Sequence, residues 1–193
     1  MRALGIHYRL GCPRKSMPGL TVLVVGGGGR EHALCLGLAD SPSIGSIHSA
    51  PGNAGTSMVG ANHTVSTSDI EELISLAAEL DADLVVVGPE VPLVNGLADS
   101  LRTAGIACFG PHAEGAMLEG SKLHAKRVMQ ELGIPTGGCL VVEEAGAIEA
   151  ALDSFKPPWV VKRDVLAAGK VVTVTADRQE AHDVLTAGLS SDG

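Results

Sequence analysis

A run of four apolar residues that ends in four glycines constrains this chain more than any other feature of its sequence. Residues 22–25 are mostly β-branched, and Gly26 to Gly29 follow at once. A helical pattern comes next, with apolar residues on one side: Ala33, Leu34, Leu36 and Leu38. Together these features predict a buried parallel strand, a turn that glycine permits, and a helix. The N–H groups at the start of such a helix favour an anion, most often a phosphate. Four glycines followed by Arg30 exceed the need of a tight turn, so we expect a phosphate site rather than a bare turn.

Two common nucleotide-binding motifs do not fit this chain. A dinucleotide fingerprint needs G-x-G-x-x-G and an acidic residue about twenty positions later. Counted from Gly26, the third glycine position holds Glu31, and the strand expected at 44–48 ends without an acidic residue. This disfavours NAD and a Rossmann-type oxidoreductase. A Walker loop ends in Lys followed by Ser or Thr, whereas residues 115–122 end in Ser121-Lys122, so we reject that motif as well.

The composition limits the class of protein. With 193 residues the chain can hold one good core, or one domain and part of another. Only four residues are Phe, Trp or Tyr, so the core must be built from Val, Leu, Ile and Ala, which suits strands covered by helices. The net charge of −8 argues against nucleic acid as a partner. No apolar run approaches the length needed to span a membrane, and the seven histidines show no zinc-ligand spacing.

The cysteines suggest a reducing compartment. They lie far apart without a C-x-x-C pair, at positions 12, 35, 108 and 139. We expect reduced, mostly buried thiols in a cytoplasmic protein that binds small molecules, with no nucleic acid or membrane partner. The sequence does not set the oligomeric state.

Residues 20–120 alternate strand and helix patterns. Residues 1–19 precede them as a loose extension that contains Met17, an alternative start to Met1. Strands are expected at 44–49, 84–87 and 106–109, and helices at 69–80, capped by Ser68, and at 93–104. This order predicts a doubly wound parallel sheet, in which ligands bind at the carboxyl ends of the strands.

Two loops are expected at that edge of the sheet. The turn at 50–55 contains Asn53 and follows the second strand, and Gly88-Pro89-Glu90 forms a rigid loop after the third. Glu90 is therefore a candidate site residue, although a solvated acid or a helix cap is the simpler interpretation of a lone Glu.

Residues 121–193 follow a different, α+β pattern. A helix at 122–132 ends at Gly133 and Pro135, and the remaining candidate elements are 140–142, a helix at 145–155, strands at 159–162 and 171–175, and a helix at 178–187. This is too little sheet to close a core well, so we interpret it as the opening part of a larger domain. Lys162 ends a strand before the small-residue loop 166–170, an arrangement that can hold a polyphosphate. On spacing alone, a hairpin with two solvated lysines is the simpler interpretation.

Several runs taken together resemble one enzyme family. They lie at 24–34, 50–56, 87–90 with 92–94, 109–111, 118–122 and 133–136, and the similarity extends over residues 20 to about 175 in one order. By these runs the chain is similar to the N-terminal part of the phosphoribosylamine–glycine ligases, also called glycinamide ribonucleotide synthetases, which are ATP-grasp enzymes. The resemblance implies a Rossmann-like pre-ATP-grasp domain, then a linker helix and the start of an ATP-grasp domain.

The resemblance also implies a reaction and a set of site residues. Family members join glycine to 5-phosphoribosylamine early in purine synthesis, through a glycyl phosphate, while ATP becomes ADP and phosphate. It implies that the sugar substrate is bound by Gly27, Gly28, Gly29, Arg30, Glu31, Asn53, Pro89 and Glu90. It implies that ATP is bound by Lys122, Lys162, Gly169 and Lys170, with Mg²⁺ or Mn²⁺ as cofactor. No residue is assigned a catalytic or metal-binding role.

This chain departs from the family pattern in two ways. Val165 and Val171 stand where the family's loop has glycines, and β-branched residues restrict positive φ, which would hinder closure of that loop. The family's chains are also much longer, so we expect the metal ligands and the rest of the ATP site beyond Gly193. We therefore expect a truncated ligase that does not complete the reaction alone. The alternative is a non-catalytic domain that binds a phosphosugar.

Overall fold

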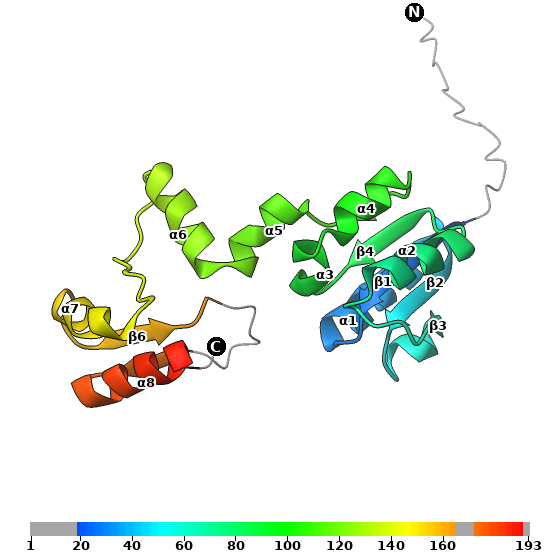
Figure 1. Cartoon of the computed structure of the whole chain (residues 1–193). Helices are drawn as coiled ribbons and strands as arrows, with labels where there is room; N and C mark the ends of the chain where they lie inside the picture. Colours follow the sequence, from blue (N-terminus) through cyan, green and yellow to red (C-terminus); the bar gives the residue numbers. More distant parts are fainter. Residues whose placement is uncertain (1–18, 165–171, 191–193) are drawn as a thin grey trace, which may run out of the picture. The chain divides into compact units, whose positions relative to one another are not determined.

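The computed structural model of the chain describes residues 19–164 and 172–190 (Figure 1). These residues form two compact units. The first, which we call the sheet unit, comprises residues 19–89 and 98–110. The second unit comprises 90–97 and the described residues from 111 onward.

The sheet unit contains a five-stranded parallel sheet in the order β3-β2-β1-β4-β5. The strands are β1 (Leu20–Gly26), β2 (Ile44–Pro51), β3 (Ala61–Asn62), β4 (Leu84–Val87) and β5 (Cys108–Phe109). The sheet extends to both sides of β1, as in doubly wound folds, which confirms the predicted fold class. In such a sheet the carboxyl ends of β1, β2 and β4 lie at one edge, which is the expected ligand edge.

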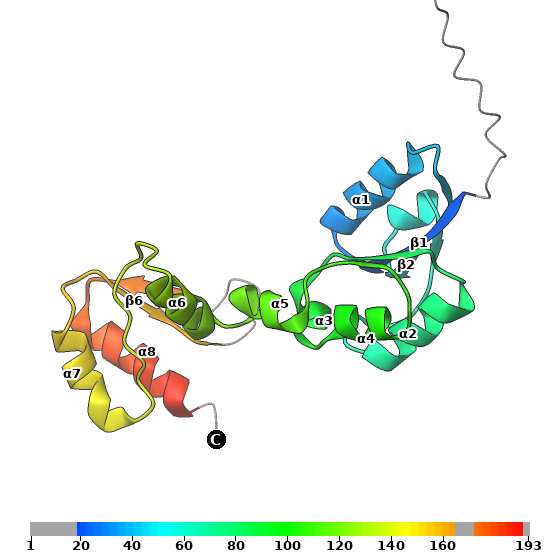
Figure 2. The same ribbon diagram turned by 90° about the horizontal axis from the view of Figure 1, so that it is seen from above.

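Helices cover both faces of this sheet (Figure 2). Helix α1 (Gly29–Ala39) lies on one face, and α2 (Ile70–Glu79) and α4 (Leu97–Thr103) lie on the other. On the α1 side, Val22 and Val24 pack with Cys35 from α1 and with neighbouring strands. All four residues at 22–25 are fully buried. A strand covered on both faces is apolar at every position, which explains the continuous run in the sequence.

Three local predictions for this part of the chain are wrong. The buried residues of α1 are Glu31 and Cys35, whereas Leu34 and Leu36, expected on the core side, are 37% and 49% exposed. The cap of α2 is Asp69 rather than Ser68, because its Oδ1 accepts the Glu72 N–H at 3.0 Å.

The helix expected at 93–104 is two helices, α3 (Glu90–Val94) and α4. They are separated near Gly96, whose φ of +85° is not helical. Glu90 thus begins a helix instead of lying in a rigid loop, and Pro92 is tolerated there because it falls in the first turn. The short elements η1 (Thr56–Met58) and β3 were not predicted.

The second unit is built around a two-stranded antiparallel sheet of β6 (Trp159–Lys162) and β7 (Val172–Thr175). Its other elements are α3, α5 (Ala113–Gly120), α6 (Lys122–Glu131), η2 (Ala145–Ala147), α7 (Ile148–Asp153) and α8 (Arg178–Ser190). Ile148 and Leu152 of α7 and Ala181 of α8 form its buried cluster, against which Trp159 and Val161 of β6 pack.

The sequence predicted most of these elements, with some errors of extent. Residues 140–142 form no strand, the helix expected at 145–155 is η2 followed by α7, and α8 continues through Gly188 to Ser190. Helix α5 was not predicted, and because it contains Gly115 and Gly120 it confirms that residues 115–122 are no Walker loop.

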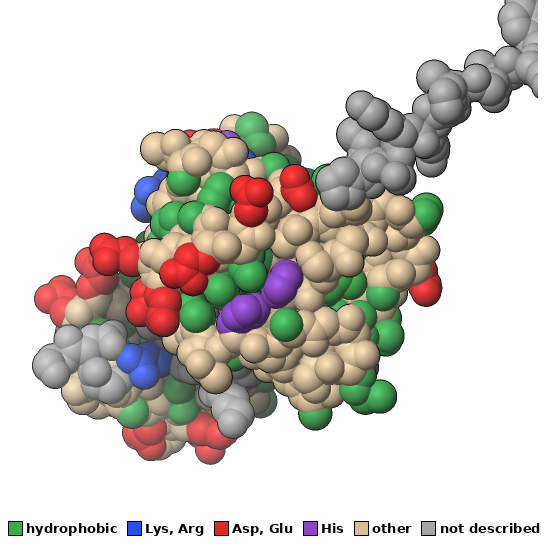
Figure 3. Space-filling view, turned by 90° about the vertical axis from the view of Figure 1, so that its right-hand side faces the viewer, with side chains coloured by type: hydrophobic (Ala, Val, Ile, Leu, Met, Phe, Trp, Pro, Cys, Tyr) green, Lys and Arg blue, Asp and Glu red, His purple; other side chains and the backbone are tan. Residues whose placement is uncertain are grey.

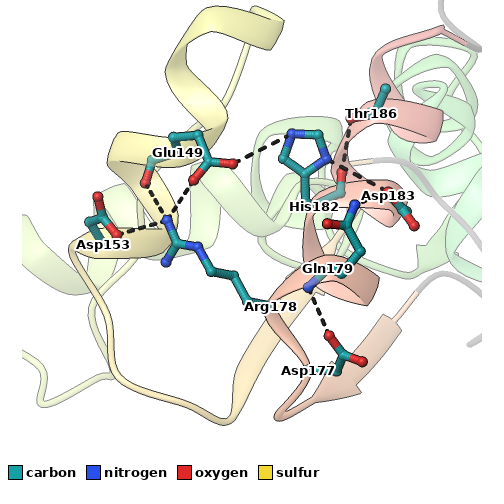
Figure 4. Close-up of polar contacts among 8 residues, drawn as sticks. All are labelled: Glu149, Asp153, Asp177, Arg178, Gln179, His182, Asp183 and Thr186. Carbon is teal, nitrogen blue, oxygen red and sulfur yellow. Dashed lines mark hydrogen bonds and ion pairs between the residues drawn. The ribbon is translucent and has the colours of Figure 1, made fainter.

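A polar cluster joins α8 to α7 (Figure 4). Nη2 of Arg178 lies 2.6 Å from Oε2 of Glu149 and 2.7 Å from Oδ1 of Asp153. The hydrogen bond to Glu149 and the neighbouring carboxylates raise the pKa of Arg178. His182 lies near the other Glu149 oxygen, at 3.7 Å.

The described cysteines differ in burial. All three are free thiols, and Cys35 is buried as expected, whereas Cys108 is half-buried and Cys139 is exposed, so the expectation of burial is wrong for Cys139. Burial raises the pKa of the Cys108 thiol. Within residues 19–164 and 172–190, no helix combines the length and the apolar character needed to cross a bilayer.

Candidate functional site

The glycine loop and the Asn53 turn are joined by one side chain. Nδ2 of Asn53 donates to the carbonyl oxygens of Gly27 and Gly28, each at 3.0 Å. Oδ1 of Asn53 accepts the N–H groups of Gly55 at 2.7 Å and Thr56 at 3.0 Å. The structure therefore brings together two loops that the sequence placed at one edge of the sheet. The Asn53 amide uses both of its N–H donors and its oxygen to hold these loops in place.

Glu31 lies beneath the glycine loop and is only 4% exposed. Its Oε2 accepts the Gly28 N–H at 2.7 Å, and its Oε1 lies 3.1 Å from Nε of Arg30. Because a buried carboxylate must be hydrogen-bonded, these two contacts account for its position. Glu31 is thus held inside the loop by the chain's own groups.

Three glycines leave the space that this carboxyl group occupies. A Cβ on Gly26 would lie 2.5 Å from Cγ of Glu31, and one on Gly28 would lie 2.8 Å from its Oε2. A Cβ on Gly88, at the end of β4, would lie 2.1 Å from its Oε1. The surplus of glycines was expected to serve a bound phosphate, but two of the four in the run, Gly26 and Gly28, leave room for an internal carboxylate.

Gly29 differs from its neighbours. A Cβ there meets nothing within 4 Å, and its φ is not in the left-handed region. Gly29 is the first residue of α1, whose first intrahelical bond runs from the His32 N–H to the Gly28 oxygen at 3.1 Å. The N–H groups of Gly29 and Arg30 therefore have no acceptor within the helix. The fold does not require glycine at position 29, whereas an approaching anion would benefit from it.

Arg30 provides charge beside this helix start. Its side chain is 64% exposed, and the contact with Glu31 uses Nε. A guanidinium group has two further nitrogens, which suit a phosphate because they form a planar fork of donors. Gly29, Arg30 and the start of α1 thus place hydrogen-bond donors and a positive charge together, a combination that can accept an anion.

The two remaining candidates for the sugar substrate follow β4. Pro89 is the last residue of the first segment of the sheet unit, 19–89. Glu90 is the first residue of α3 and belongs to the second unit. Both residues are half-buried.

Two of the candidate ATP ligands lie at the ends of elements in the second unit. Lys122 is the first residue of α6, and Lys162 is the last residue of β6. Asp164, which sequence analysis did not single out, follows β6 and accepts the Lys122 N–H at 2.6 Å. The other candidates, Gly169 and Lys170, lie outside the described residues, as do Val165 and Val171.

The β6–β7 hairpin has one apolar face in contact with solvent. Val160 pairs with Val174, and Lys162 pairs with Val172, so these four side chains share a face. The valines are 44–63% exposed, whereas Trp159 and Val161 on the opposite face pack against the helices. An apolar face that ends in a lysine suits a ligand with a flat apolar part and an anionic part. This exposed face was not predicted, because residues 159–161 are all apolar and show no alternation that would separate a buried face from an exposed one.

No metal centre emerges from the side chains that the structure describes. Among residues 19–164 and 172–190, no group of three or more His, Cys, Asp or Glu residues is placed to hold a metal ion. These residues therefore do not by themselves fit the expected Mg²⁺ or Mn²⁺.

Comparison with known proteins gives consistent results. The family model described as "Phosphoribosylglycinamide synthetase, N domain" matches residues 20–119, and that of the "ATP-grasp (A) domain" matches residues 120–192. Among curated relatives, the phosphoribosylamine–glycine ligase of Mycobacterium tuberculosis is 50% identical over 167 residues, which is 84% of this chain and 40% of the relative. That of Streptomyces coelicolor is 51% identical over 162 residues, 84% of this chain and 39% of the relative.

Solved structures show the same relationship. The crystal structure of phosphoribosylamine–glycine ligase from Thermotoga maritima matches with a TM-score of 0.68 and 31% identity, over 85% of this chain and 38% of that one. An ADP complex of N5-carboxyaminoimidazole ribonucleotide synthetase matches with a TM-score of 0.72 at 20% identity, over 89% of this chain and 45% of that one, which shows a shared fold. The chain spans about 40% of the length of the curated relatives. With both family models matching in order, the chain belongs to the phosphoribosylglycinamide synthetase family.

Proposed function

We propose that this chain is part of an ATP-dependent ligase that joins glycine to 5-phosphoribosylamine and gives glycinamide ribonucleotide. The observation that carries the proposal is the start of α1. Position 29 holds glycine although a Cβ there would meet no other atom within 4 Å, and the side chain of the next residue, Arg30, is exposed. The identity of about 50% with curated phosphoribosylamine–glycine ligases supports the same conclusion.

In this proposal the start of α1 binds the phosphate of the sugar. The N–H groups of Gly29 and Arg30 and the Arg30 guanidinium act as donors to the phosphate. Asn53 and Glu31 hold the glycine loop in the shape that presents them. Pro89 and Glu90 are the remaining proposed substrate-binding residues.

The second unit would bind ATP. Lys122 and Lys162 neutralise charge on the phosphates, which favours attack on the terminal phosphoryl group by the glycine carboxylate. The exposed valine face of the β6–β7 hairpin would support the nucleotide base. A divalent cation, Mg²⁺ or Mn²⁺, would neutralise further phosphate charge when bound, and we assign none of the described residues to it. We also propose that the enzyme is cytoplasmic and that the 193 residues alone do not complete the reaction.

Binding of ribose 5-phosphate tests the sugar site directly. We expect weak binding to the wild-type chain, observed by NMR titration, and a loss of roughly tenfold or more in Gly29→Val, because the side chain blocks a charged contact worth about 1.5–3 kcal/mol. Gly37→Val is the matched control, since Gly37 also lies in α1 with open space around it. Equal affinity of the two variants would contradict the assignment. Binding of ribose 5-phosphate without any binding of ATP would instead favour a non-catalytic phosphosugar-binding domain.

A further inference from the structure

The start of helix α6 is capped by a residue from a distant part of the chain. Asp164 lies 42 residues beyond Lys122, and its Oδ1 accepts the N–H groups of Lys122 at 2.6 Å and Leu123 at 3.3 Å. Its Oδ2 accepts the Ser121 hydroxyl at 2.8 Å. The first N–H groups of a helix have no acceptor within the helix, so a carboxylate at this position satisfies them.

Ser121 completes this cap and belongs to the same network. Its Oγ accepts the His124 N–H at 3.0 Å while donating to Asp164. The N–H groups of the first three residues of α6 are thus bound by two side chains, one local and one from the segment after β6. Partial burial alone would raise the pKa of Asp164, but the hydrogen bonds from Ser121, Leu123 and Lys122 and the Lys122 charge outweigh it and lower that pKa. Asp164 is therefore ionised at neutral pH.

The contact joins the two elements that carry the proposed ATP lysines. Lys122 is the first residue of α6, and Lys162 is two residues before Asp164. We propose that Asp164 is a positioning residue that fixes the start of α6 to the end of β6, so that Lys122 and Lys162 present one site for the ATP phosphates. This inference rests on the proposed function, in which both lysines bind those phosphates.

Electrostatics and positioning predict opposite effects on ATP affinity. A carboxylate near two lysines repels an incoming polyphosphate, so if Asp164 acted only through its charge, Asp164→Asn would bind ATP more tightly. If Asp164 positions the lysines, the same substitution separates the helix start from the strand end and ATP binds more weakly. The sign of the change therefore distinguishes the two roles.

The experiment is an NMR titration of the 193-residue chain with ATP. We expect Asp164→Asn and Asp164→Ala to shift the Lys122 and Leu123 amide protons upfield and to raise the Kd for ATP about tenfold, with partial recovery in Asp164→Glu. Asp177→Asn is the matched control, because Asp177 caps α8 by accepting the Gln179 N–H at 2.8 Å and does not contact α6. It should leave both the two amides and the Kd unchanged.

Two kinds of failure are distinguishable. Unchanged or tighter ATP binding in Asp164→Asn, or amide protons of Lys122 and Leu123 that do not move, would overturn the positioning role. If the wild-type chain shows no ATP binding, or if Lys122→Ala and Lys162→Ala leave its Kd for ATP unchanged, the proposed nucleotide site is refuted and the inference falls with it.

Discussion

Substitution of Gly88 tests whether the glycines at this edge of the sheet enclose the Glu31 carboxyl group. A Cβ on Gly88 would lie 2.1 Å from Oε1 of Glu31 and 2.6 Å from its Cδ and Cγ. Contacts this short require movement, and Glu31 is 4% exposed and held by Gly28, so it has little room to move. Overpacking of this kind costs about 1–3 kcal/mol of folding free energy. We expect Gly88→Ala to destabilise the sheet unit by that amount.

The clash has a specific partner, so a double-mutant cycle isolates it. Glu31→Ala alone removes the buried carboxylate that accepts the Gly28 N–H, which costs about 1.5–3 kcal/mol. In the Glu31→Ala background the Gly88 methyl group meets an empty space, so Gly88→Ala should cost little there. The two substitutions should then be non-additive by roughly 1–3 kcal/mol, the range seen for residues in contact.

Urea denaturation followed by the amide signals of residues 22–25 reports on the sheet unit alone. Gly29→Ala is the control, because its Cβ meets nothing and alanine favours a helix, so stability should be unchanged or rise by up to about 1 kcal/mol. Additive costs of Gly88→Ala and Glu31→Ala would refute the argument that the carboxyl group occupies the space left by Gly88.

Other substitutions test further contacts. Asn53→Ala removes two hydrogen bonds to the glycine loop and two within the Asn53 turn, and should cost roughly 2–4 kcal/mol in sheet-unit unfolding, at about 1 kcal/mol for each bond; a loss below 1 kcal/mol would contradict this role. Trp159→Phe removes the bond from Nε1 to the Leu152 oxygen at 3.1 Å and should destabilise the second unit by about 1 kcal/mol, measured by urea denaturation of α8 amides. Burial and the neighbouring His63 lower the pKa of His48. Nε2 of His63 lies 3.0 Å from Nδ1 of His48. Histidine side chains are visible at the surface in Figure 3. Because the unfolded chain then binds more protons, sheet-unit stability should fall as the pH drops below about 6.5, and His48→Gln should reduce that fall.

The sequence was sufficient to predict the parallel sheet and the pairing of the two loops. Residues 22–25 form an uninterrupted apolar run only because both faces of β1 are covered, and that requirement leaves a clear pattern. The Asn53 turn was predicted correctly at the carboxyl edge of the sheet, since it follows a strand parallel to β1. Both results depend on local patterns and on the rule that parallel strands end at one edge.

The roles of individual side chains could not be predicted in the same way. Glu31 is buried on α1 although a charged residue is expected to face solvent, and its burial depends on space left by Gly88, 57 residues later in the chain. The contact of Asp164 with α6 likewise joins distant segments. Such contacts follow from tertiary packing and leave no periodic signal. The prediction that the side of α1 with Leu34 and Leu36 faces the core was wrong for the same reason.

An internal carboxylate next to a proposed phosphate site raises an electrostatic problem, and Arg30 offers its solution. Glu31 and a sugar phosphate would both be anions near the start of α1, and like charges in a partly buried setting repel each other. Nε of Arg30 already contacts Oε1 of Glu31, while the Arg30 side chain as a whole is 64% exposed. One guanidinium can bind two anions at once because its donors point in different directions, whereas a lysine ammonium is a single point charge. The pairing of Arg30 with Glu31 therefore compensates the buried charge through Nε alone, so that the two terminal nitrogens of the guanidinium can serve the phosphate that is proposed to bind there.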